Sequence, residues 1–89
     1  MELGPVGKRI KSKLETALAP SLLEVIDESH FHVGHAGAHA EGESHFRVKV
    51  TSAAFAGKSR VMQYRMVNEV LAEELRQRVH ALAVETGVP

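Results

Sequence analysis

Apolar side chains near the start of the chain recur with the spacing of an α-helix. Pro5 suits a first helical position, and the apolar residues that follow at intervals of four are Val6, Ile10, Leu14 and Leu18. The pattern predicts a one-sided helix that ends near Ala19, because the residue before Pro20 resists helical geometry. The basic residues on its other faces are either simply solvated or bind a partner.

Two later segments have the patterns of β-strands. The segment from Ser21 to Glu28 is apolar, β-prone and too short for a globular helix. From His45 to Thr51 the chain alternates strictly. The predicted buried face carries Phe46, Val48 and Val50, and the wet face carries His45, Arg47, Lys49 and Thr51. The two strands can pair antiparallel, although the segment between them is much longer than a hairpin turn requires, and such segments are usually functional or disordered.

The second half of the chain predicts a turn, a helix and a third strand. The turn spans 52–58, with Phe55 as its hydrophobic anchor, and Ser59 suits the N-cap of a helix that runs to about Arg76. The predicted buried stripe is Val61, Tyr64, Val67, Leu71 and Leu75, flanked by Met62, Met66 and Val70. The predicted solvated face carries Glu73, Glu74, Arg76 and Arg78. The third strand is predicted over 79–84.

This order of elements, helix, strand, strand, helix, strand, predicts an α/β (α+β) fold. A crossover through the second helix should place the third strand parallel to a neighbour, with a right-handed connection. We expect a two-layer sandwich, with a three-stranded mixed sheet and the helices on one face. The open face would then show Arg47 and Lys49.

Composition limits the functions that this chain can have. Its 89 residues predict a single domain over 1–89, and its 11 basic and 11 acidic residues cancel, which argues against a general polyanion binder. There are no cysteines, so an iron–sulfur cluster bound here would take its thiolates from another molecule. The absence of an apolar run of membrane-spanning length and of a signal peptide predicts a soluble, cytoplasmic protein.

The most unusual segment is rich in histidine. Five of the six histidines lie between Ser29 and Phe46, separated mainly by glycine and alanine; they are His30, His32, His35, His39 and His45. Neutral imidazole is a common metal ligand, and small neighbours leave it accessible. The composition fits either a metal-binding segment or a flexible polar loop.

No catalytic constellation is visible elsewhere. The chain has no nucleophilic serine in a G-x-S-x-G context, no H-E-x-x-H motif and no phosphate-binding loop. We therefore expect a protein that is not an enzyme. His80 lies apart from the other histidines, where the second helix gives way to the third strand, and taken alone it suits a structural role. To act as a ligand, it would have to lie at the frayed start of that strand.

Ordered blocks along nearly the whole chain resemble the BolA family. They are Asp27-Glu28-Ser29-His30, Gly42-Glu43-Ser44-His45-Phe46-Arg47-Val48, Phe55-Ala56-Gly57-Lys58-Ser59, Arg65-Met66-Val67, Leu71-Ala72-Glu73-Glu74-Leu75 and Val79-His80-Ala81-Leu82-Ala83-Val84. The resemblance implies a class II KH-like fold, in agreement with the predicted order of elements. It also implies a partner of monothiol Cys-Gly-Phe-Ser glutaredoxins, which shares a bridging 2Fe–2S cluster in iron–sulfur trafficking or in iron or redox regulation.

The resemblance also implies the cluster ligands. One is the histidine of the C-terminal block, here His80, and the second comes from the loop between the first two strands. In this chain the second ligand would be a histidine, with His35 first, His32 next and His39 third. The glutaredoxin and glutathione would supply the thiolates, and mixed His/Cys ligation of this kind raises the potential of a 2Fe–2S centre.

Two other functions stay open. Some BolA proteins are DNA-binding transcriptional regulators, and the contacts here would be Lys58, Arg60 and Arg65. Against that stand the zero net charge and Gln63-Tyr64-Arg65 where the family usually has a basic-His-Arg triplet. The loop histidines alone, as His32 with His35 or His35 with His39, could also chelate zinc or nickel.

Overall fold

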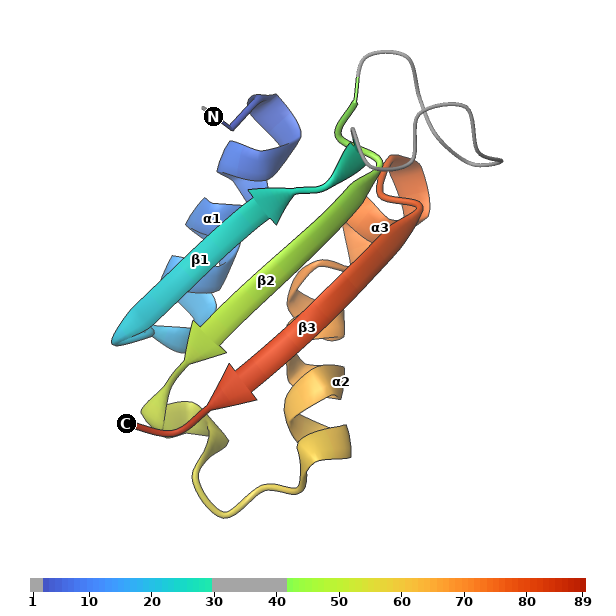
Figure 1. Ribbon diagram of the computed structural model, residues 1–89. Helices are drawn as coiled ribbons and strands as arrows, with labels where there is room; N and C mark the ends of the chain where they lie inside the picture. The colour runs from blue at the N-terminus through green and yellow to red at the C-terminus, as the bar shows by residue number, and fades with distance from the viewer. Residues whose placement is uncertain (1–2, 30–41) are drawn as a thin grey trace.

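The computed structural model describes residues 3–29 and 42–89 and contains a mixed sheet with helices behind it (Figure 1). The helices and strands are α1 (Pro5–Leu18), β1 (Leu22–Asp27), β2 (His45–Thr51), α2 (Arg60–Val70), α3 (Ala72–Gln77) and β3 (Ala81–Gly87). A short 3-10 helix, Ala53–Phe55, fills the predicted turn. Among the described residues, no helix has the length and apolar character needed to cross a membrane.

The sheet has the predicted topology. Its strand order is β1-β2-β3, with β1 antiparallel and β3 parallel to the central strand β2. All three helices lie on the same side of the sheet (Figure 1). The predicted α/β sandwich, with a three-stranded mixed sheet and helices on one face, is therefore confirmed.

The hydrophobic core lies between the helices and the inner face of the sheet. The buried face predicted for β2 is confirmed, since Phe46, Val48 and Val50 are all buried. The other buried apolar residues are Ile10, Leu14, Leu18, Phe55, Val67, Leu71 and Val79. Phe55 is the predicted anchor of the turn. These residues join α1, the turn and α2 to one side of β2, which fixes the helices relative to the ends of the strands.

The second helix differs from its prediction in two ways. It is broken at Leu71, whose φ of −102° and ψ of 15° separate α2 from α3. Val61, predicted on the buried stripe, is 58% exposed, and Met62 is 44% exposed. At about 100° per residue, Val61 lies roughly 120° around the helix from the buried Val67, so the two cannot face the same core. The apolar stripe is shorter than the sequence pattern suggested.

The third strand begins later than predicted. Val79 is buried, and its backbone N–H donates to the carbonyl of Glu74 (2.7 Å), so it is held against the C-terminal end of α3 and does not pair in the sheet. The strand then extends to Gly87, which pairs with Thr51 of β2. The shift of two residues leaves His80 in a bend directly before β3.

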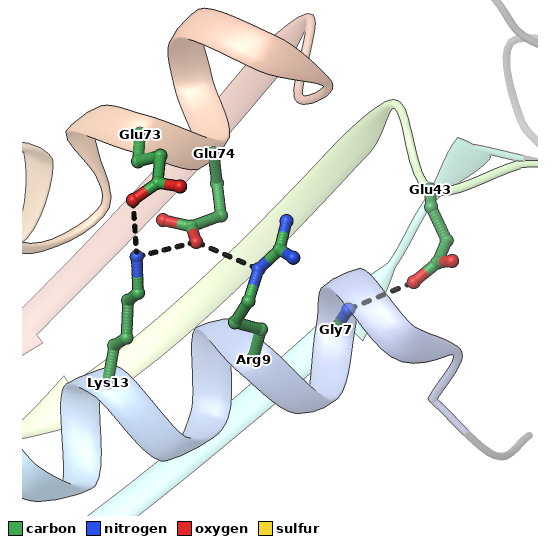
Figure 2. A network of polar contacts seen from close by, with 6 residues as sticks. All are labelled: Gly7, Arg9, Lys13, Glu43, Glu73 and Glu74. Carbon is green, nitrogen blue, oxygen red and sulfur yellow. Dashed lines mark hydrogen bonds and ion pairs between the residues drawn. The ribbon is translucent and has the colours of Figure 1, made fainter.

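Glu74, predicted on a solvated face, is fully buried. Its Oε2 lies 3.0 Å from Arg9 Nε and 2.7 Å from Lys13 Nζ, so α1 supplies two cations to a carboxylate of α3 (Figure 2). Its other oxygen is buried without a hydrogen-bond partner among the described residues. Glu73 is half exposed and lies 3.6 Å from Lys13. The prediction for Glu74 was wrong because its side chain lies on the same helical face as the buried Val67 and Leu71, where Arg9 and Lys13 of α1 neutralise its charge.

The pKa of Glu74 results from opposing effects. Burial on its own would raise it, but the hydrogen bonds from Lys13 and from its own backbone, with the charges of Lys13 and Arg9, lower the pKa below the usual 4.5. A carboxylate whose pKa is lowered by folding stabilises the folded state above its unfolded-state pKa. That contribution is lost as the pH falls through the lower, folded-state value.

Replacing Glu74 by glutamine should therefore lower the free energy of unfolding by about 1–3 kcal/mol at pH 7, because it leaves two cations without their carboxylate. The deficit relative to wild type should narrow as the pH falls below 4.5. Urea unfolding over a pH series measures both effects. Glu73→Gln is the matched control and should change stability by no more than about 0.5 kcal/mol. Equal effects of the two substitutions would contradict a structural role for the buried carboxylate.

Candidate functional site

The end of the sheet where β1 finishes and β2 and β3 begin is the candidate functional site. The described chain stops at Ser29 and resumes at Gly42, and both residues lie at this end. The predicted ligands of the histidine-rich segment, His32, His35 and His39, lie outside the described residues, as does His30. The structure describes the two stems of that segment and the surroundings of His45 and His80.

One carboxylate holds the two stems together. Asp27 Oδ1 accepts a hydrogen bond from the backbone N–H of Ser29 (2.9 Å), and Oδ2 accepts one from the N–H of Glu43 (3.2 Å). Arg78, which follows α3, donates to the carbonyl of Gly42 (2.7 Å). Gly42 and Glu43 have φ values of +77° and +60°. Glutamate adopts that left-handed conformation only at a cost of about 1 kcal/mol, which the hydrogen bonds to Asp27 and Arg78 offset.

Buried serines extend these contacts into the sheet. The Ser29 hydroxyl oxygen accepts hydrogen bonds from the backbone N–H groups of Ser44 (2.8 Å) and His45 (3.1 Å). The carbonyl of Ser44 in turn accepts from the N–H groups of His80 (2.6 Å) and Ala81 (3.1 Å). The first residues of β2 and β3 are therefore joined at Ser44, and the backbone of His80 is fixed to the base of the histidine-rich segment.

His80 lies at the start of the third strand, where the sequence required a ligand histidine to be. It lies immediately before β3 and is exposed to solvent, with its backbone held by Ser44. Its ring centroid is 5.8 Å from that of His45, at an interplanar angle of 50°. Its predicted role as a ligand stays a prediction.

The sequence placed His45 on the wrong face of β2. It was expected on the wet face with Arg47, but it is only 8% exposed. Its Nδ1 lies 2.9 Å from the hydroxyl of Ser44, and its ring is a neighbour of the His80 ring. The parallel register that sets His45 opposite Ala81 brings the two rings together, and the sequence alone does not give that register. The imidazoles of His45 and His80 are therefore neighbours, which the sequence did not predict.

A metal or a cluster would need more ligands than the described residues bring together. In the described parts, 3–29 and 42–89, no three or more histidine, cysteine, aspartate or glutamate side chains are grouped to hold a metal ion. An exposed imidazole on a fixed backbone nevertheless suits a shared site, because the remaining ligands can come from the histidine-rich segment and from a partner. The donor chemistry therefore fits a cluster completed by another molecule.

Glu43 also connects this site to the start of α1. Its Oε2 accepts a hydrogen bond from the backbone N–H of Gly7 (2.9 Å), shown in Figure 2. The N-cap residue of α1, Gly4, offers no side-chain cap, so the carboxylate takes that place. A negative charge there is also favourable to the helix dipole. The stem of the histidine-rich segment thus holds the first turn of α1.

The basic residues predicted for nucleic acid lie elsewhere. Lys58, Arg60 and Arg65 are exposed, at the turn before α2 and along its first half. On the open face of the sheet, Arg47 is 2.9 Å from Glu28 and 3.0 Å from Glu85. The two carboxylates offset its charge, so Arg47 adds little positive potential to that face.

Comparison with known proteins places the chain among relatives. The family model described as BolA-like protein matches residues 14–89. An uncharacterised protein from Sinorhizobium sp is 52% identical over 81 residues, which cover 90% of this chain and 87% of that protein. BolA-like protein 1 from Mus musculus is 46% identical over 97% of this chain, but the chain spans only 60% of that relative.

Two further matches bear on function and fold. The DNA-binding transcriptional regulator BolA of Escherichia coli (strain K12) is 44% identical over 91% of this chain and 73% of that protein. The solved BolA domain of SufE1 from Arabidopsis thaliana superposes with a TM-score of 0.90 and 42% identity, covering 99% of this chain and 96% of that chain. This match agrees with the fold that the sequence predicted.

Substituting Ser29 by alanine should destabilise this end of the sheet selectively. The change leaves two buried N–H donors without an acceptor and should lower the free energy of unfolding by about 2 kcal/mol. Urea unfolding measures the loss, and amide hydrogen exchange should be faster at Ser44 and His45. Ser21→Ala is the control, because the exposed Ser21 hydroxyl makes only a 3.4 Å contact with the Thr51 carbonyl. Unchanged exchange at both amides would show that the hydroxyl does not hold β2.

Proposed function

The chain belongs to the BolA-like protein family, and from this premise we propose that it is a non-enzymatic partner of monothiol Cys-Gly-Phe-Ser glutaredoxins. In the heterodimer the two proteins share a 2Fe–2S cluster, in iron–sulfur trafficking or in iron or redox regulation. The single observation that carries the proposal is His80, an exposed imidazole whose backbone is fixed at the base of a histidine-rich segment. The family comprises regulators and partner proteins, and no catalytic family is indicated.

His80 supplies one ligand in this proposal. The second comes from the histidine-rich segment, with His35 ahead of His32 and His39. This chain has no cysteine, so the glutaredoxin and glutathione supply the thiolates. Bound in this way, the cluster would provide a redox centre of higher potential than one held by four thiolates.

The anchored backbone supports this division of roles. Ordering a ligand on binding costs conformational entropy, and a ligand that is already held avoids that cost. His80 is already placed by the hydrogen bond from its N–H to the Ser44 carbonyl, so its ordering costs little. His45, beside it, is positioned to restrict the orientation of the His80 ring.

A second candidate function is DNA binding. It is favoured by the name of the relative from Escherichia coli and by the exposure of Lys58, Arg60 and Arg65. Binding led by phosphate contacts depends on an excess of cations, and this chain has a net charge of zero. We therefore rank DNA binding below the glutaredoxin partnership.

The ligand assignment is tested by reconstituting the cluster with a Cys-Gly-Phe-Ser glutaredoxin, glutathione, iron and sulfide. The wild-type protein should form a heterodimer whose visible absorption and circular dichroism differ from those of the glutaredoxin homodimer. His80→Ala should abolish that difference and shorten the lifetime of the shared cluster by roughly tenfold. Spectra and cluster decay recorded for His35→Ala, His32→Ala and His39→Ala then identify the second ligand.

His30→Ala serves as the control, because it removes an imidazole from the same segment that is not among the proposed ligands. Its spectrum and cluster lifetime should match those of the wild type. A wild-type spectrum for His80→Ala would overturn the assignment. A spectrum altered by His45→Ala but by none of the three loop variants would move the second ligand to His45.

A further inference from the structure

A surface at the start of α2 combines apolar and basic side chains that the proposed glutaredoxin partnership does not use. It consists of the apolar residues Val61 and Met62 and the cations Lys58, Arg60 and Arg65, which we call the α2 surface. All five side chains are exposed, with Val61 at 58% and Met62 at 44%. Arg65 follows Val61 by four residues and Met62 by three, so the cation and the two apolar side chains share one face of the helix.

The α2 surface rests on a firmly held base. The Ser59 hydroxyl accepts a hydrogen bond from the backbone N–H of Met62 (3.2 Å) and so caps the helix. The Gln63 side chain donates to the carbonyls of Phe55 (3.2 Å) and Lys58 (3.0 Å) and accepts from the hydroxyl of Thr86 in β3. Turn, helix and strand are thus joined beneath the exposed residues. A surface that is already ordered loses little entropy when it binds.

The charged residues around the α2 surface are all basic in sequence. Between Thr51 and Asn68 the sequence contains no aspartate or glutamate, although the chain as a whole is neutral. The first turn of α2 carries no acidic residue and contains Arg60, so the positive end of the helix dipole adds to the side-chain charges. A ligand that complements this surface is negatively charged and carries apolar side chains for Val61 and Met62.

We propose that the α2 surface docks an acidic segment of a partner protein, whose apolar side chains cover Val61 and Met62 while its carboxylates pair with Lys58, Arg60 and Arg65. Nucleic acid complements the charges but not the apolar centre. Nonspecific single-strand binders use exposed aromatic side chains for stacking, and the only aromatic residue of α2, Tyr64, is half-buried. The combination of cations with exposed apolar side chains therefore favours a protein ligand over a nucleic acid.

This site is separate from the His80 end of the sheet. Gln63 of α2 contacts Thr86, six residues along β3 from His80, which corresponds to about 20 Å of extended chain. Figure 1 shows the start of α2 and the start of β3 at opposite ends of the molecule. A partner at the α2 surface leaves the His80 end free, so the inference stands whether or not the proposed function is correct.

The test uses the full-length, ¹⁵N-labelled protein and a designed peptide of about 15 residues, long enough to form a helix. One face of the peptide carries leucine and the flanks carry glutamate. Amide chemical shifts should change over residues 58–66, and binding should weaken as salt is added. Val61→Asp should raise the Kd by at least about tenfold, the equivalent of losing one well-buried apolar contact.

Two control variants test whether peptide binding depends on the position of the substitution and on the sign of the surface charge. Leu22→Asp introduces the same change at a similarly exposed residue, 54%, of β1, and should leave the Kd within about twofold of wild type. The double variant Arg60→Glu, Arg65→Glu should no longer bind the glutamate peptide. It should instead bind a peptide in which lysine replaces glutamate. Dispersed amide spectra establish that each variant is folded, as expected for exposed positions.

Several results would overturn the inference. These are shift changes centred outside 58–66, no binding of the leucine–glutamate peptide, or an unchanged Kd for Val61→Asp. Equal binding of polyglutamate would show that charge alone is recognised. A DNA duplex that binds the same residues more tightly than the peptide at equal salt would assign the surface to nucleic acid.

Discussion

The structure depends most on the hydrogen bonds that meet at Ser44. Its N–H donates to the Ser29 hydroxyl, and its carbonyl accepts from the N–H groups of His80 and Ala81. Ser44 is completely buried, so water cannot replace a lost partner. Leaving either its N–H or its carbonyl without a hydrogen bond would cost about 1–3 kcal/mol. The geometry of the candidate site follows, because the same contacts close the histidine-rich segment, start two strands and fix the backbone of His80.

The helix layer is joined to this junction through two carboxylates. Glu43 holds the N-terminus of α1 from the stem of the histidine-rich segment, and Glu74 of α3 holds Arg9 and Lys13 further along the same helix (Figure 2). Sequence-distant segments therefore converge around α1. A structural change at Gly42 or Glu43 would therefore act on α1 through the hydrogen bond between Glu43 and Gly7.

Much of the fold could be predicted from the sequence because it follows from local periodicity. The buried face of β2 and the four-residue spacing in α1 depend only on which side chains face a core, and both were confirmed. The burial of Glu74 and of His45 could not be predicted, because each depends on a neighbour from a distant segment. Val61 shows the opposite error, since an apolar residue in a helix was assumed to be buried. For the site, the sequence placed His80 within the third strand, whereas the structure leaves it directly before β3, and its contact with His45 required the register of β2 and β3.

The central claim is that an imidazole of this chain binds a cluster whose thiolates come from elsewhere. Pulsed electron paramagnetic resonance of the reduced heterodimer tests it most directly, with this protein labelled in ¹⁵N-histidine and the glutaredoxin left unlabelled. The account predicts strong ¹⁵N hyperfine coupling from two imidazoles of this chain, reduced to one in His80→Ala. A cluster that shows no ¹⁵N coupling would contradict it.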